Sequence, residues 1–85
     1  MKFEKTVIKD PAFPGPEYED VFYISGIYKI RYFHSHPDTN RPGYSAFYKP
    51  NGWKNWGNYV DRSRKVYATL KAAKEACEKH ADAAA

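Results

Sequence analysis

Positively charged and aromatic side chains gather in the middle of the chain. Residues 27–65 include eight cations and only two anions, which gives this segment a net charge of +6. Nine of the fifteen aromatic residues also lie in it. Cations neutralise phosphates and flat rings stack on bases, so the two together suit a nucleic-acid surface. The cations are Lys29, Arg31, Arg41, Lys49, Lys54, Arg62, Arg64 and Lys65. This segment predicts a non-catalytic module that binds DNA or RNA.

Two kinds of contact are expected from this segment. The predicted phosphate ligands are Lys29, Arg31, Lys49, Lys54, Arg62, Arg64 and Lys65, and the predicted stacking or wedging rings are Tyr48, Trp53 and Trp56. Two alternatives stay open. The cations can form an ordinary solvated face. Residues 53 and 56 also point to opposite sides of a regular strand, so one tryptophan can pack against the core instead.

Histidine, cysteine and acidic residues offer little for a metal. His34, His36 and Asp38 alternate, so in an extended loop they point the same way, and imidazole and carboxylate are common ligands. Zinc normally takes three or four protein ligands at defined spacing. Cys77 and His80 lie three apart on an expected helix, where a packed thiol beside a boundary histidine is the favoured interpretation. We expect no metal and no cofactor.

Catalysis is not expected either. The chain has no glycine-rich phosphate loop. Its serines have no nucleophile-elbow context. Glu17, Glu19 and Asp20 lie in a proline-rich stretch, which is a poor place to preorganise two carboxylates. The sequence therefore predicts a binding protein and not an enzyme.

Composition limits the kind of domain. Eighty-five residues predict one domain, residues 1–85, and one cysteine excludes an internal disulfide. No apolar run reaches the roughly 18 residues of a membrane span. We therefore expect a soluble, cytoplasmic protein without a membrane partner. One leucine, four isoleucines and four valines are a thin aliphatic stock, so aromatic rings must supply much of the core.

An acidic, proline-rich segment occupies residues 10–20. Its three prolines disfavour both helix and central strand, so it is predicted to be an extended connector. It is either a plain linker or a segment that lies over the basic region and screens it.

Strands are expected on both sides of a polar loop at 34–43. The clearest alternation is in 27–33, where Tyr28, Ile30 and Tyr32 point one way and Lys29 and Arg31 the other. Further strands are predicted at 3–8, 21–25, 44–49, 53–60 and 65–68, with a Pro-Asn-Gly turn at 50–52.

A helix is expected after the strands. Thr69 is suited to be its N-cap, and it runs from Leu70 to about Ala81, with residues 82–85 as a frayed tail. Small residues such as Ala73 and Cys77 form its apolar stripe, so the helix can lie close to a ring-lined sheet. The predicted fold is α+β: an antiparallel sheet of three to five strands with one C-terminal helix packed on one face.

The order of elements in residues 43–81 resembles a known family. A strand, an Asn-Gly turn, a tryptophan-rich strand, a short strand and the helix Thr69-Leu70-Lys71-Ala72-Ala73-Lys74-Glu75-Ala76 follow one another. This order is similar to the plant ethylene-response type of DNA-binding domain and its relatives in phage and mobile-element integrases. The resemblance implies three strands that read the major groove, with a helix behind them. Lys29 and Arg31 match its arginine-rich first strand only in part, and Val66-Tyr67-Ala68-Thr69-Leu70 stands where the family has a Trp-Leu-Gly-Thr-Phe-like strand end.

A second function stays open. The short aromatic chain with an alanine-rich terminal helix also looks like small orphan proteins of phages, some of which block host defence or transcription. Exposed Tyr, Trp and Arg are typical of protein hot spots, so the same face can bind a host protein. The acidic connector favours this alternative, because nucleic acid would repel it. Composition neither supports nor excludes a third role, as a minor structural subunit.

Overall fold

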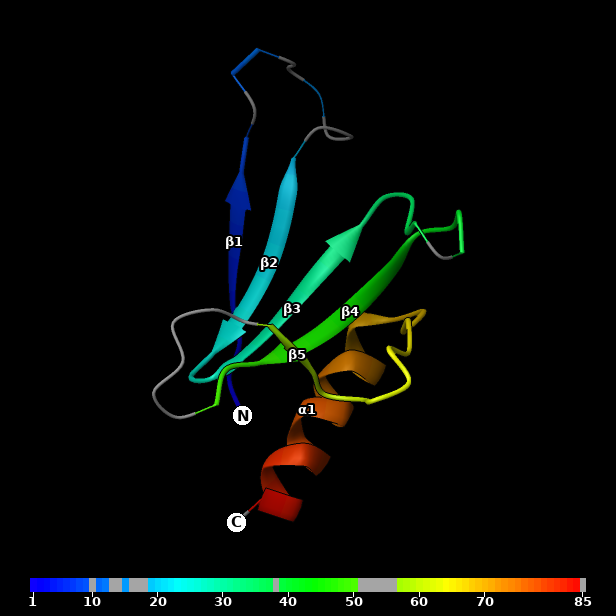
Figure 1. Ribbon diagram of the computed structural model, residues 1–85. Helices are drawn as coiled ribbons and strands as arrows, with labels where there is room; N and C mark the ends of the chain where they lie inside the picture. Colours follow the sequence, from blue (N-terminus) through cyan, green and yellow to red (C-terminus); the bar gives the residue numbers. More distant parts are fainter. Residues whose placement is uncertain (10, 13–14, 16–18, 38, 51–56, 85) are drawn as a thin grey trace.

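In the part of the chain that the structure describes, five antiparallel strands form one sheet and one helix follows them (Figure 1). The computed structural model describes residues 1–9, 11–12, 15, 19–37, 39–50 and 57–84. The elements are β1 (Glu4–Ile8), β2 (Asp20–Ser25), β3 (Tyr28–Phe33), β4 (Gly43–Tyr48), β5 (Asn58–Tyr59) and α1 (Leu70–Ala84). Strands that follow one another in sequence are neighbours in the sheet. The predicted α+β architecture is confirmed.

Strand β3 at the centre of the sheet explains how the two faces differ. Tyr28 and Ile30 are buried, with 5% and 0% of their surface exposed, whereas Lys29 and Arg31 point to the other face and stay half-buried. Ile30 lies opposite Ala46 of β4, whose small side chain leaves room for the helix. The predicted alternation in this strand is therefore confirmed.

The segment 65–68 does not form the predicted strand. It makes one bridge to β4, in which the backbone N–H groups of Tyr44 and Tyr67 each donate to the other's carbonyl oxygen at 2.8 Å. Just before it, Arg64 has a φ of 59°, which is left-handed backbone that interrupts an extended path. The chain therefore touches the sheet at one residue and then turns into the helix.

Two predicted segments fall largely outside the described residues. Positions 51–56 hold the Asn-Gly turn and the site candidates Trp53, Lys54 and Trp56, so only the end of the predicted strand 53–60 is described, as β5. Gly57 directly precedes β5 and is not part of it. Glycine weakens a strand, which agrees with the start of β5 at the next residue. In the acidic connector, positions 10, 13–14 and 16–18 are also outside, and Asp20 is already the first residue of β2.

Helix α1 begins as the sequence predicts. The Thr69 hydroxyl accepts a hydrogen bond from the Ala72 backbone N–H at 3.1 Å, which satisfies a free donor of the first turn. The helix continues to Ala84, beyond the expected end at residue 81, because the last turn is rich in alanine, the best helix former.

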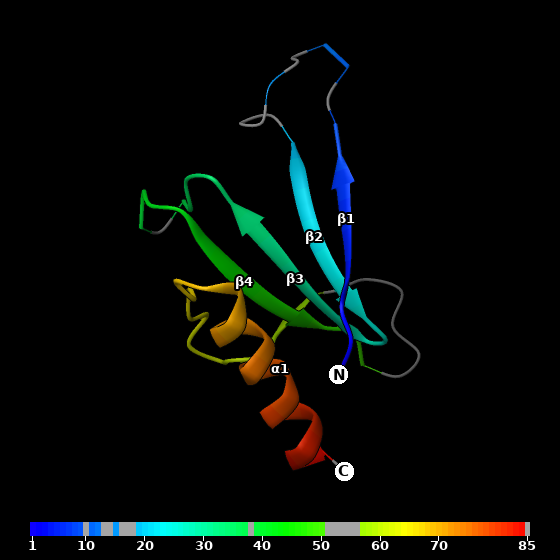
Figure 2. The ribbon, with the colours of Figure 1, turned by 180° about the vertical axis from the view of Figure 1, so that it is seen from behind.

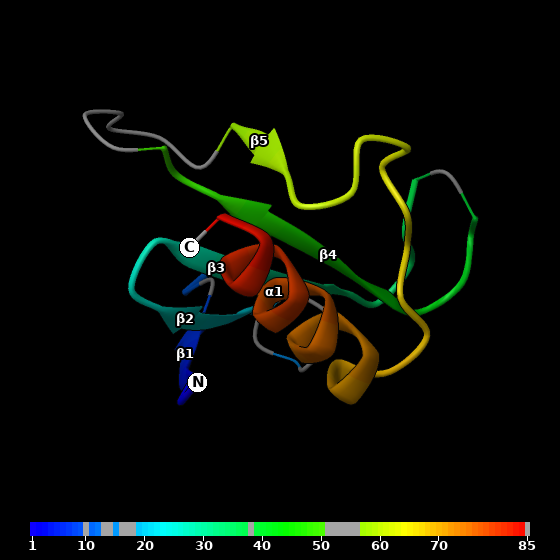
Figure 3. The same cartoon turned by 90° about the horizontal axis from the view of Figure 1, so that it is seen from below.

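The helix covers only half of one sheet face. It packs against β4 and β3, as Figure 3 shows, and makes no comparable contact with β1 or β2. Figures 1 and 2 view the sheet from its two sides and show β1 and β2 beside the helix, at the far side of the sheet from β5. The helix thus lies on one face of the sheet and does not cover the opposite face.

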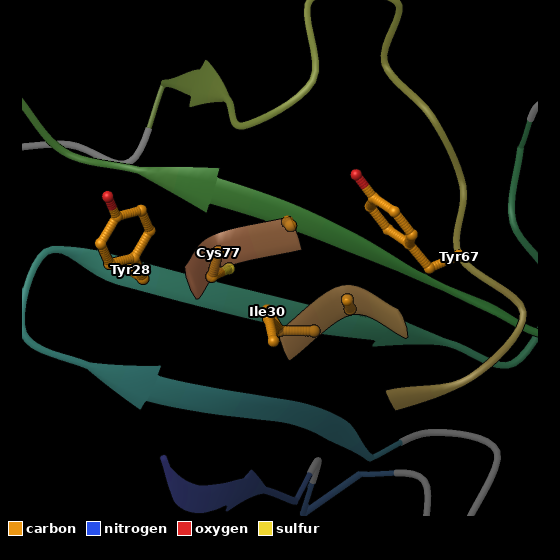
Figure 4. Packing of buried hydrophobic residues seen from close by; sticks show 6 residues of the cluster. Tyr28, Ile30, Tyr67 and Cys77 are labelled. Carbon is orange, nitrogen blue, oxygen red and sulfur yellow. The ribbon is translucent and has the colours of Figure 1, made fainter. Parts of the chain in front are cut away.

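A small core lies between the helix and the central strands (Figure 4). Its buried members are Tyr28, Ile30, Ala46, Tyr67, Ala73 and Cys77. The Tyr28 ring reaches the edge of this core, where its hydroxyl bonds to Nδ1 of His80 at 2.8 Å. Tyrosine can therefore serve as core here, because its apolar ring is inside and its polar end has a partner.

Alkaline pH should destabilise the fold through Cys77. Burial raises the pKa of this thiol from 9.0 to about 12. Below pH 9 both states keep the proton; above it the unfolded thiol ionises and the folded one does not. The free energy of unfolding should therefore fall by about 1 kcal/mol per pH unit as pH rises from about 9 towards 12. Urea denaturation at about pH 8 and 10 measures this, and the loss should be smaller in Cys77→Ala. An equal loss in both proteins would assign the effect to the tyrosines.

Candidate nucleic-acid interface

The side of the sheet that faces away from the helix carries a distinct set of side chains, which we call the open face. The strand register and the alternation of each strand place on it Glu4, Thr6, Ile8, Asp20, Phe22, Ile24, Lys29, Arg31, Phe33, Ser45, Phe47 and Tyr59. Its aromatic rings are half-buried, so they lie in the surface and do not project from it. The open face therefore presents flat rings with cations among them.

Lys29 stands at the middle of one row across the sheet. It lies opposite Ile24 of β2 and Phe47 of β4, and Phe47 in turn lies opposite Tyr59 of β5. The rings of Phe47 and Tyr59 are in contact, with centroids 4.7 Å apart. This row therefore joins an aliphatic residue, a cation and a pair of rings.

Arg31 stands at the middle of the next row, opposite Phe22 and Ser45. The Lys29 ammonium lies 4.2 Å from the centroid of the Phe22 ring, and the Arg31 guanidinium lies 4.6 Å from that of Phe33. Both distances are within the range of cation–π attraction. The two central cations of the open face are thus held over aromatic rings.

Arg31 also affects the ionisation of its neighbour Lys29. Partial burial, and after it the neighbouring Arg31, lower the pKa of Lys29. Asp20, the first residue of β2, lies 3.5 Å from the Arg31 guanidinium, and about half of its side chain is exposed. An ion pair this exposed contributes little free energy, so an anionic ligand can replace Asp20 as the partner of Arg31.

Residues 34–37 and 39–42 belong to a loop that lies at one end of the open face. His36 is 5% exposed; its Nε2 lies 3.0 Å from the Ser45 hydroxyl, and its ring centroid lies 4.6 Å from that of Phe33. Backbone bonds from Thr39 and Asn40 to the His36 carbonyl hold the loop in this shape. His36 is therefore a structural residue that joins this loop to β3 and β4.

Arg64 brings a third cation to the edge of the face. Its guanidinium lies 5.6 Å from the centroid of the Tyr59 ring. The turn before it is held by Asp61, whose carboxylate accepts bonds from the Ser63 hydroxyl at 2.6 Å and the Ser63 backbone N–H at 2.8 Å. These bonds lower the pKa of Asp61 and keep it ionised in the turn. Arg64 is thus positioned by an ordered turn.

The structure brings together some of the predicted site residues and separates others. Lys29 and Arg31 are adjacent on the open face, with Arg64 at its edge, while Arg62 is exposed in the turn nearby. Lys65 lies 5.5 Å from the Tyr67 ring and lines a groove beside the helix.

Tyr48 belongs to the opposite side of the sheet. It pairs with Tyr28, and its ring lies 4.3 Å from that of His80 on the helix. Lys49 follows at the end of β4, where its backbone N–H donates to the Ile27 carbonyl at 2.8 Å. Tyr48 therefore does not share a surface with Lys29, and the stacking role predicted for it has no support here.

Sequence reasoning missed the rings of the open face, which are Phe22, Phe33, Phe47 and Tyr59. A signal was available for Phe33, because residues 29, 31 and 33 are alternate positions of one strand and therefore share a face. The others needed the register between strands, which no single segment reveals.

The described residues show neither a metal site nor a membrane-spanning helix. No group of three or more His, Cys, Asp or Glu side chains gathers there as a metal site, and Asp38 lies outside them. Cys77 is buried in the core and His80 bonds to Tyr28, as the packed interpretation of that pair predicts. Across those same positions, no helix has the length and apolar character needed to cross a membrane.

Comparison with protein-family models, with curated proteins and with solved structures found no match. The resemblance to ethylene-response and integrase domains therefore stays a prediction from the sequence.

Proposed function

We propose that this protein is a non-catalytic nucleic-acid-binding module that uses the open face. The observation that carries the proposal is the pairing of cations with rings: Lys29 over Phe22, Arg31 over Phe33 and Arg64 over Tyr59. Rings of this kind stack on bases, each worth about 1–3 kcal/mol, and the cations beside them neutralise phosphates.

Binding would exchange one set of weak contacts for a stronger set. An exposed cation–π contact contributes about 0.5–1 kcal/mol, which is less than a stacked base contributes. A base that stacks on Phe22 displaces the Lys29 ammonium, which then lies near the phosphate of that nucleotide. The exchange therefore favours the complex, and the intramolecular contacts keep the rings covered by cations when no ligand is bound.

The test is an anisotropy titration of labelled DNA and RNA, single-stranded and double-stranded, at about 50 mM salt. We expect saturable binding that weakens as salt is raised, because cations of the open face release counterions from the phosphates. The absence of binding to all four ligands at this salt concentration would rule the proposal out.

A second function uses the same face: a small phage-type inhibitor that binds a host protein of the defence, transcription or nucleic-acid-handling machinery. The observation that favours it is the acidic rim of the open face, where Asp20 and Glu4 would repel a phosphate backbone. Arginine and aromatic rings are also typical of protein hot spots. A pull-down from nuclease-treated host lysate separates the two, because a stoichiometric protein partner retained after nuclease favours the inhibitor.

A further inference from the structure

The width of the sheet decides which form of nucleic acid the open face can accept. Its strands lie about 4.8 Å apart, so five strands span roughly 19 Å, whereas the major groove of B-DNA is about 12 Å wide. A groove of that width admits a helix or a two-stranded ribbon and not a five-stranded face. Phe22 lies on β2 and Phe47 on β4, with another strand beyond each of them. These rings therefore cannot reach base edges inside a duplex.

The depth of the rings leads to the same conclusion. Side chains that kink a duplex must project between its base pairs, as a wedge does. Phe22 and Phe47 are half-buried in the sheet surface, and each is packed against a neighbour, the Lys29 ammonium for Phe22 and the Tyr59 ring for Phe47. A ring in such a surface offers one flat side. Only an unpaired base has a free flat side to match it.

The spacing of rings and cations fits one strand of nucleic acid. Phe22 and Phe47 are two strands and one two-residue step apart, which is about 12 Å. Lys29 lies between them, opposite Ile24 and Phe47. A single strand that crosses from β2 to β4 can therefore stack one base on each ring while Lys29 and Arg31 lie beside its backbone.

Resting on the function proposed above, we infer that the open face binds single-stranded nucleic acid in preference to duplexes, with bases stacked on Phe22 and Phe47. The three cations Lys29, Arg31 and Arg64 give an expected slope of log affinity against log salt of about −2 for a single strand. Stacking does not depend on salt in this way, so much of the affinity should persist at higher salt.

The experiment compares a labelled strand of about 15 nucleotides with the same strand annealed into a blunt duplex, in both DNA and RNA. We expect the single strand to bind at least about tenfold more tightly than the duplex, because only unpaired bases stack. Equal or tighter binding of the duplex overturns this inference and leaves the proposed function standing. No binding of either form overturns both.

Matched variants test the two rings. Phe22→Leu and Phe47→Leu keep an apolar side chain and remove the ring, and each should weaken single-strand binding about tenfold. Tyr23→Leu is the control, because Tyr23 is next to Phe22 on β2 but faces the helix side. It should lower thermal stability and leave affinity within about twofold. Wild-type affinity in both phenylalanine variants would overturn the stacking geometry.

Photo-crosslinking of the wild-type protein keeps the test independent of how the variants fold. A single strand with photoreactive pyrimidines should crosslink to the peptides that contain Phe22 and Phe47. Crosslinks confined to helix α1 would overturn the assignment of the open face.

Discussion

Replacing Ile30 with alanine is expected to lower the free energy of unfolding by about 2–5 kcal/mol. Ile30 has no exposed surface and sits where β3, β4 and the helix meet (Figure 4). The change removes apolar area and leaves a cavity that the surrounding sheet cannot fill. A chain of this length has a total stability of only about 4–13 kcal/mol, so the expected loss is a large fraction of it.

Urea denaturation followed by circular dichroism measures this loss. The matched control is Ile8→Ala, the same substitution in β1 at a position that is 54% exposed. It should change the free energy of unfolding by no more than about 0.5 kcal/mol. Similar losses in the two variants would mean that the core is not centred on β3 and the helix.

Local patterns predicted most of the fold. The alternation around Lys29 and Arg31 correctly predicted the two faces of β3, and Thr69 correctly predicted the start of the helix. Both are local signals, since they depend on residues within one strand or one helical turn. The segment 65–68 was predicted wrongly, because its apolar residues satisfy a strand pattern while the left-handed Arg64 beside it prevents a ladder.

The site was harder to predict because rings occupy both faces of the sheet. The two tyrosines 28 and 67 are in the core, whereas phenylalanines 22 and 47 are on the open face, the reverse of what polarity alone suggests. The reason is that the hydroxyl of Tyr28 reaches a partner at the edge of the core, in His80. Such a partner lies 52 residues away in the sequence, so no local pattern contains it.

Reversing both central charges of the open face is expected to weaken single-strand binding by more than about 100-fold. In the double variant Lys29→Glu and Arg31→Glu, two phosphate contacts are lost and two carboxylates face the phosphates, and like charges in an interface cost several kcal/mol. Glu at position 31 would also lie beside Asp20, so circular dichroism must first show that the sheet is retained.

The control reverses two cations elsewhere, in Lys5→Glu and Lys71→Glu. Both lysines are exposed, Lys5 on the helix side of β1 and Lys71 on the helix, and either double variant lowers the formal net charge from +4 to zero. The control should weaken binding by only about two- to fivefold, because charges beyond a Debye length of about 10 Å are largely screened. If anisotropy titrations at matched salt gave the same loss for both variants, binding would depend on the charge of the whole molecule. Only a large difference between them locates the ligand on the open face.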